Sequence, residues 1–101
     1  MTVNEELREA ERTGKVLLGS NQSVEATKEK ESRLTVLSTT CPFEVEEKVR
    51  RYSEEKDVPV YYYEGGGNEL GLAFGKPFSV AAAAIIEPGD SSVLEVGESF
   101  R

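Results

Sequence analysis

Three short polar stretches of the chain have residues suited to binding a ligand through hydrogen bonds: 19–23, 38–42 and 64–68. The amide side chains of Asn21, Gln22 and Asn68 can each donate and accept hydrogen bonds, which suits the edges of nucleic-acid bases. Glycines in the first and third stretches let a backbone approach a ligand closely. The alternative is that Ser20 and Asn68 only cap helices while the glycines only turn corners.

The glycine triplet at residues 65–67 invites a phosphate-binding interpretation, which fails on spacing. A Walker motif ending at Gly75 and Lys76 needs glycine at position 70 and serine or threonine at position 77. The chain has Leu70 and Pro77 there. A dinucleotide-binding pattern counted from Gly65 requires a glycine at the same position 70. Nucleotide hydrolysis is therefore not expected.

Side chains for enzymatic chemistry are scarce. The sequence has no histidine, which removes the usual general base, the commonest metal ligand and every Ser-His or Cys-His pair. Cys41 is the only cysteine, so no internal disulfide can form and a reducing compartment is indicated. A helix start at Cys41 would lower its thiol pKa, but a small packed residue beside Pro42 is the simpler interpretation. We expect no catalysis, no cofactor, no metal and no small-molecule substrate.

The net charge of −7 counts against nucleic acid, because an acidic protein repels phosphates at ordinary salt. The excess of acidic residues is typical of a solvated surface. The alternative is adaptation to high salt, where the Debye length falls to about 3 Å near 1 M and long-range repulsion is screened. No apolar run approaches the roughly 20 residues that span a bilayer. The acidic N-terminus is unlike a signal peptide, so we expect a cytoplasmic protein without a membrane partner.

The elements that must position the three stretches alternate between helix and strand. Thr2 and Glu5 form a capping box before a helix that Gly14 ends, and Asn68 is the expected N-cap of a short helix through Phe74. The remaining helices are predicted at residues 21–30 and 43–56, and the four main strands at 15–18, 33–38, 58–63 and 78–86. Residues 93–96 are predicted as an additional edge strand beyond these four.

This order predicts an α/β protein: a three-layer α/β/α sandwich with a four-stranded mixed sheet, formed by residues 1–101 as one domain. The polar, thin-faced helix at residues 21–30 should lie on the surface, and the apolar run at residues 78–86 should be a central strand. In such sheets, ligands bind beyond the carboxyl ends of strands. The three polar stretches, each of which follows a strand, should therefore converge on one site.

Several motifs of the chain occur together in one known family. They are TGKVLLG at residues 13–19 followed by Ser23-Val24, GGGNELG at 65–71, FGKPFSV at 74–80 and IIEPGDS at 85–91. In their order and spacing, from about Leu7 to Leu94, the chain resembles the L-thirty-e family of archaeal and eukaryotic large ribosomal subunits. That family lies within the kink-turn-binding superfamily that includes the L-seven-Ae proteins.

The resemblance implies binding to a kinked internal loop of the large-subunit RNA. The residues that it assigns to the sheared guanine–adenine pairs are Gly19, Ser20, Asn21, Gln22 and Ser23. Those on the second side of the site are Thr40, Gly67 and Asn68, with Lys76 as a phosphate contact. Phe78 would contact an unstacked base, a type of contact worth about 1–3 kcal/mol.

Three positions depart from the family pattern. Glu25 stands where a lysine is usual, Thr40 where an asparagine is common, and Ser79 where a basic residue is often found. Each change removes a cation or a hydrogen-bonding arm, and affinity from counterion release depends on the number of phosphate contacts. Shape and base edges, rather than phosphates, should therefore dominate recognition.

The leading hypothesis is a structural constituent of the large ribosomal subunit, in the cytoplasm, with ribosomal RNA and ribosomal proteins as partners. One alternative is an adaptor for a kinked RNA outside the ribosome. The other is a protein–protein interaction domain like those of release and surveillance factors, which the three departures favour.

Overall fold

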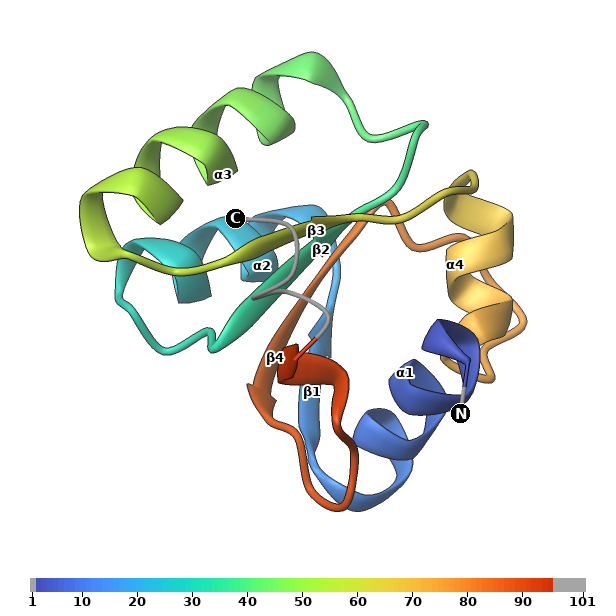
Figure 1. Ribbon diagram of the computed structural model, residues 1–101. Helices are drawn as coiled ribbons and strands as arrows, with labels where there is room; N and C mark the ends of the chain where they lie inside the picture. Colours follow the sequence, from blue (N-terminus) through green and yellow to red (C-terminus); the bar gives the residue numbers. More distant parts are fainter. Residues whose placement is uncertain (1, 96–101) are drawn as a thin grey trace.

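The computed structural model describes residues 2–95, in which four principal helices alternate with four strands (Figure 1). This confirms the alternation predicted from the sequence. In chain order the elements are α1 (Val3–Thr13), β1 (Lys15–Leu18), α2 (Ser20–Lys28), β2 (Leu34–Leu37), α3 (Phe43–Lys56), β3 (Val60–Tyr62), α4 (Gly67–Ala73) and β4 (Ala82–Glu87).

The strands form one mixed sheet in the order β1-β4-β2-β3. Strands β2 and β3 are parallel, with Val36 opposite Tyr61, and α3 makes the crossover between them. Strand β4 is antiparallel to both of its neighbours, so Val36 also lies opposite Ala83. Strands β1, β2 and β3 consequently run in one direction, and their carboxyl ends lie at the same end of the sheet.

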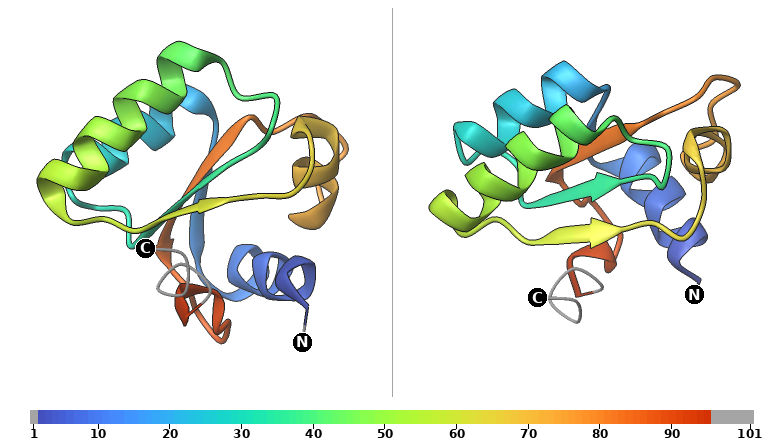
Figure 2. Two further views of the ribbon diagram at one scale, coloured as in Figure 1. Left: turned by 45° about the horizontal axis from the view of Figure 1, so that its top comes forward. Right: turned by 90° about the horizontal axis from the view of Figure 1, so that it is seen from above.

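Helices cover both faces of the sheet: α2 and α3 lie on one, α1 and α4 on the other (Figure 2). Side chains of a strand alternate between the two faces. Val36 of β2 accordingly packs in the cluster with Leu7 of α1 and Phe74 at the C-cap of α4, while Leu37 packs with Val49 of α3. The predicted α/β class and mixed sheet are confirmed, in three layers.

Strand β4 is the central strand that the apolar run predicted, but the predicted start at residue 78 was wrong. Ala82, Ala83 and Ala84 are completely buried, and small side chains suit a strand covered on both faces. Residues 78–81 precede the strand and follow α4, where the Val80 amide donates to the Gly67 carbonyl at 2.9 Å. Because that hydrogen bond holds this segment against α4, the chain joins the sheet only at Ala82.

A buried polar network lies between α2 and the sheet. The Thr27 hydroxyl is 2.7 Å from the hydroxyl of Thr35 and donates to the Ser23 carbonyl at 2.8 Å. The Ser32 hydroxyl lies 2.9 Å from that of Thr35. The side chains of all four residues are buried. The face of α2 that packs on the sheet is therefore held by hydrogen bonds as well as by the apolar contact of Ala26.

The starts of α4 and α3 differ from what the residue types there suggest. Helix α4 begins at Gly67 with Gly66 as its N-cap, so Asn68 is an exposed residue of the first turn and not the cap. The side chain of Phe43 in α3 is 67% exposed, whereas that of Val49 is fully buried. The place of Phe43 as the first residue of α3 puts it beyond the edge of the apolar cluster.

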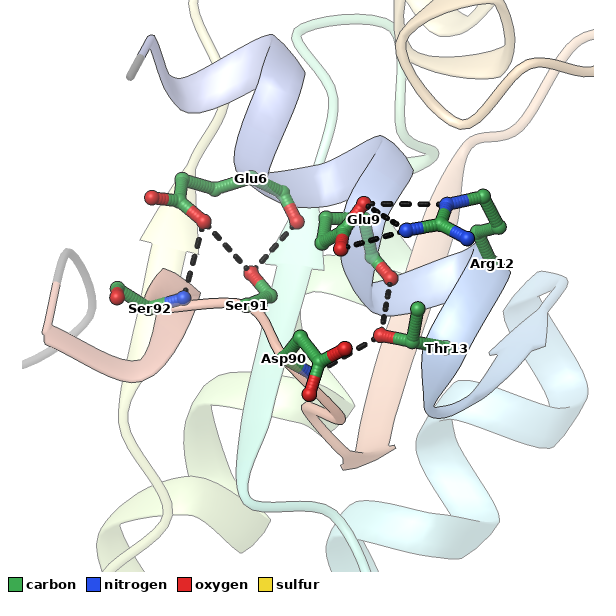
Figure 3. Close-up of polar contacts among 7 residues, drawn as sticks. All are labelled: Glu6, Glu9, Arg12, Thr13, Asp90, Ser91 and Ser92. Atoms are coloured by element: carbon green, nitrogen blue, oxygen red, sulfur yellow. Dashed lines mark hydrogen bonds and ion pairs between the residues drawn. The ribbon is translucent and has the colours of Figure 1, made fainter.

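The segment after β4 packs on α1 and does not form the predicted edge strand (Figure 3). Residues 93–95 form a helical turn, and Val96 lies outside the described residues. The Glu6 carboxylate accepts the Ser92 amide at 2.9 Å, and the Ser91 hydroxyl lies 2.6 Å from the Glu6 carbonyl oxygen. The Asp90 amide donates to the Thr13 hydroxyl at 2.9 Å. Backbone donors that a strand would use are thus bonded to α1 instead.

Candidate nucleic-acid interface

Hydrogen bonds join the three strand-to-helix loops at one end of the sheet, as the sequence predicted. The Gly19 amide donates to the Ala82 carbonyl at 2.9 Å, at the point where β1 ends beside the start of β4. The Ser38 amide donates to the Ala81 carbonyl at 2.9 Å. The Thr39 amide donates to the Gly65 carbonyl at 2.9 Å, which connects the second loop to the third. The loops and residues 78–81 therefore form one continuous surface.

The first loop places two amide side chains in solvent. Gly19 has φ of 144° and ψ of 151°, a conformation that is essentially restricted to glycine. Asn21 and Gln22 follow it in the first turn of α2 and are exposed, while Ser20 is half-buried. Ser23 is fully buried, and its hydroxyl donates to the Gly19 carbonyl at 2.6 Å. Ser23 thus holds the loop from inside, beneath the exposed amides.

The start of α2 differs from that of every other principal helix in the described chain. The first turn of each of the other three carries acid: Glu5 and Glu6 in α1, Glu44 and Glu46 in α3, and Glu69 in α4. Helix α2 has no acidic residue there and no side-chain cap. Backbone N–H groups at a helix start carry partial positive charge and need acceptors. The start of α2 is therefore the one best suited to an acceptor from a ligand.

Thr40 of the second loop caps α4 from outside the helix. The N-cap residue, Gly66, has no side chain with which to accept a hydrogen bond, and its own amide contacts the Glu69 carboxylate at 3.4 Å. The Gly67 amide instead donates to the Thr40 hydroxyl at 2.9 Å. This cross-loop cap fixes the second and third loops relative to each other.

Gly67 lies too close to its neighbours for a larger residue. A Cβ atom placed on it would be 2.3 Å from the Ser79 hydroxyl oxygen and 3.2 Å from that of Thr40. Asn68 is the next residue and is exposed at the same helix start. The structure thus brings Thr40, Gly67 and Asn68 together, as the resemblance implied.

The two remaining predicted contacts lie in the segment between α4 and β4. Phe78 is 54% exposed, so its ring is accessible to a partner. Lys76 is half-buried, and its ammonium group lies 3.3 Å from the Glu11 carboxylate of α1. The structure therefore leaves the Phe78 ring open, while the charge of Lys76 is partly compensated within the protein.

The described part of the chain contains neither an activated thiol nor a cluster of metal-ligating side chains. Burial, and to a smaller extent the charge of Glu46, raises the pKa of the Cys41 thiol, the opposite of a reactive cysteine. Within residues 2–95 no group of three or more acidic, cysteine or histidine side chains is placed to hold a metal. None of the described helices has the length and apolar character needed to cross a membrane.

Comparison with known proteins gives this geometry a context. The model of the Ribosomal protein L7Ae/L30e/S12e/Gadd45 family matches residues 1–95. The chain belongs to this family. It is 43% identical over 101 residues to the large ribosomal subunit protein eL30 of Methanothrix thermoacetophila, covering 100% of this chain and 94% of that protein. It is 41% identical to the eL30 protein of Methanosphaera stadtmanae, covering 97% of this chain and 100% of the relative.

A solved structure supports the fold alone. A protein of unknown function from Bacillus halodurans superposes with a TM-score of 0.82 at 22% sequence identity, covering 97% of both chains. The family assignment therefore rests on the sequence matches, and the superposition agrees with the layered architecture.

Two of the three departures from the family pattern have structural roles that the sequence did not reveal. Thr40 supplies the cap of α4, and Ser79 stands directly against Gly67. For the capping role of Thr40, the only signal in the sequence was that a polar residue follows soon after the predicted second strand. Glu25 is exposed one helical turn beyond Asn21, so it is a surface charge beside the first loop.

Proposed function

We propose that this family member is a structural constituent of the large ribosomal subunit that binds a kinked internal loop of ribosomal RNA. The eL30 relatives, which match almost the whole chain, support the ribosomal part. The observation that carries the RNA-binding part is the start of α2. Its first turn lacks acid and a side-chain cap, and it presents Asn21 and Gln22 to solvent.

The proposed mechanism is recognition of shape and base edges. Asn21 and Gln22 donate to and accept from the edges of the sheared base pairs, with the α2 amides as further donors. Asn68 contributes the same chemistry from the start of α4, on the second side of the site. Phe78 covers the face of a base that has left the stack. No bond is made or broken, so the protein acts by fixing one conformation of the RNA.

Titration of a kink-turn RNA tests this proposal, with a regular duplex of the same length as the control RNA. Asn21→Ala is expected to weaken binding by about 1–2 kcal/mol, or roughly 5- to 30-fold, because a base-edge contact is lost. Ser92→Ala removes an exposed polar side chain from the segment after β4, remote from the three loops, and should leave affinity unchanged. Equal affinities for Asn21→Ala and the unaltered protein would mean that RNA binds elsewhere.

Fractionation of cell extract on a sucrose gradient tests the ribosomal assignment separately. A ribosomal constituent is expected to sediment with the large subunit. Kink-turn binding in the test tube without co-sedimentation would favour an adaptor for a non-ribosomal RNA. Absence of both kink-turn binding and co-sedimentation would favour a protein partner.

A further inference from the structure

The surface that we propose for RNA contains almost no positive charge. The three loops and the segment at residues 77–80 contain neither lysine nor arginine, and they include one acidic residue, Glu64, which is exposed. The nearest predicted cation, Lys76, already faces Glu11 at 3.3 Å. Few phosphates can therefore be neutralised directly by this surface.

The charges nearest the first loop are carboxylates. Helices α2 and α3 run side by side in the same direction, and both start at the loop end of the sheet (Figure 2). Asn21, Glu25 and Glu44 line one open groove between them. Glu25 lies four residues from Asn21, or about 6 Å along the helix axis. Counted from the loop end, the first charged side chain of each helix is thus a carboxylate.

Two lysines line the same groove farther from the loop. Lys28 lies seven residues beyond Asn21, about 10 Å along α2, and Lys48 lies one turn beyond Glu44 on α3. The separation between Asn21 and Lys28 exceeds the Debye length of about 8 Å at physiological salt, whereas the separation between Asn21 and Glu25 does not. The carboxylates therefore dominate the potential at the first loop, and the net charge of −7 adds to it.

We propose that this interface binds RNA together with the cations that surround it, so that affinity rises as monovalent salt increases. The inference rests on the proposed function and adds to it the ionic form of the ligand. An ordinary nucleic-acid site releases cations when lysine or arginine replaces them, and its affinity falls with salt. Here nothing replaces them, and screening removes the repulsion between phosphates and the two carboxylates.

The retained cations are diffuse rather than held at a discrete protein site. No described group of three or more ligating side chains is placed to hold a metal. Potassium at sufficient concentration should consequently serve as well as a divalent ion at the same ionic strength. The base-edge and aromatic contacts, which are nearly independent of salt, set the affinity once repulsion is screened.

The test measures kink-turn affinity between about 0.1 and about 1 M KCl for the unaltered protein and for Glu25→Lys/Glu44→Lys. The unaltered protein is expected to bind more tightly as salt increases. The charge-reversed protein should bind about tenfold more tightly at the lowest salt, and its slope of log affinity against log salt should be lower by about 1–2. Folding of the RNA depends on salt in the same way for both proteins, so the slope difference reports on the protein.

Two further variants keep the test decisive. Glu31→Lys/Glu55→Lys makes the same change in net charge at exposed positions far from the first loop, just beyond the end of α2 and in the last turn of α3, and should shift the slope much less. Glu25→Gln/Glu44→Gln covers the case in which lysine at the start of α3 impairs folding, and it should still raise affinity at low salt. Affinity of the unaltered protein that falls with salt, or equal slope shifts for the near and far pairs, would overturn the inference alone. Absence of binding for all variants at every salt would overturn the proposed function as well.

Discussion

The cross-loop cap at Thr40 predicts a specific loss of stability when its hydroxyl is removed. Thr40→Val keeps the shape of the side chain but leaves the Gly67 amide, the first of α4, without the acceptor that lies 2.9 Å away. Gly66 has no side chain to replace it. Loss of a cap typically costs 0.5–2 kcal/mol, and the bond is only partly buried, so we expect about 1 kcal/mol.

Thermal or urea unfolding measures this cost directly. In a domain of this size about 1 kcal/mol corresponds to a decrease in Tm of roughly 4–8 °C. Thr40→Ser is the matched control, because it keeps the hydroxyl and loses only a methyl group, and it should retain most of the stability. If the valine and serine variants unfold at the same temperature, the cap contributes nothing and our account of how the two loops are joined is wrong.

Three other outcomes follow from close contacts in the structure. Gly67→Ala should destabilise the protein by about 1–3 kcal/mol, despite the better helix propensity of alanine, because its Cβ would collide with the Ser79 hydroxyl. Adding Ser79→Gly should restore part of that loss, which a double-mutant cycle measures. Thr27→Val should cost about 1–3 kcal/mol in urea unfolding because buried polar groups lose a partner, while the added Thr35→Val change should cost little more. Since burial raises its thiol pKa, Cys41 should react with iodoacetamide at pH 8 more slowly in the native protein than in the urea-unfolded chain.

Local patterns in the sequence predicted most of the framework. The capping box at Thr2 and Glu5 is present, with the two hydrogen bonds at 2.8 and 3.2 Å. The β1 strand was predicted with its observed bounds, and the loop that follows it ends in a helix start with Asn21 exposed. These features depend on residues within a few positions of one another, which is why a single sequence contains the information.

Features that depend on distant parts of the chain were missed. The apolar run after Phe78 predicts a strand, yet its first residues are held to α4 through the Val80–Gly67 hydrogen bond. Val93 belongs to a helical turn because Glu6 takes the backbone donor of the preceding residue. The cap supplied by Thr40 comes from 27 residues away. None of these partners is visible in the local pattern.

The arrangement of acid at the loop end of the sheet reflects two opposing requirements. Helices that follow parallel strands all start at the ligand end, and acidic residues in a first turn stabilise them by about 0.3–1 kcal/mol each. Glu44 and Glu46 do this for α3, and Glu69 for α4. The same charges repel a phosphate backbone. Helix α2 has no acidic residue in its first turn. Hydrogen bonds of the buried Thr27 and Ser23 hydroxyls stabilise it instead, which leaves its start open to a ligand. This helix is thus stabilised at its buried face rather than at its exposed end, as the proposed RNA site in an acidic protein requires.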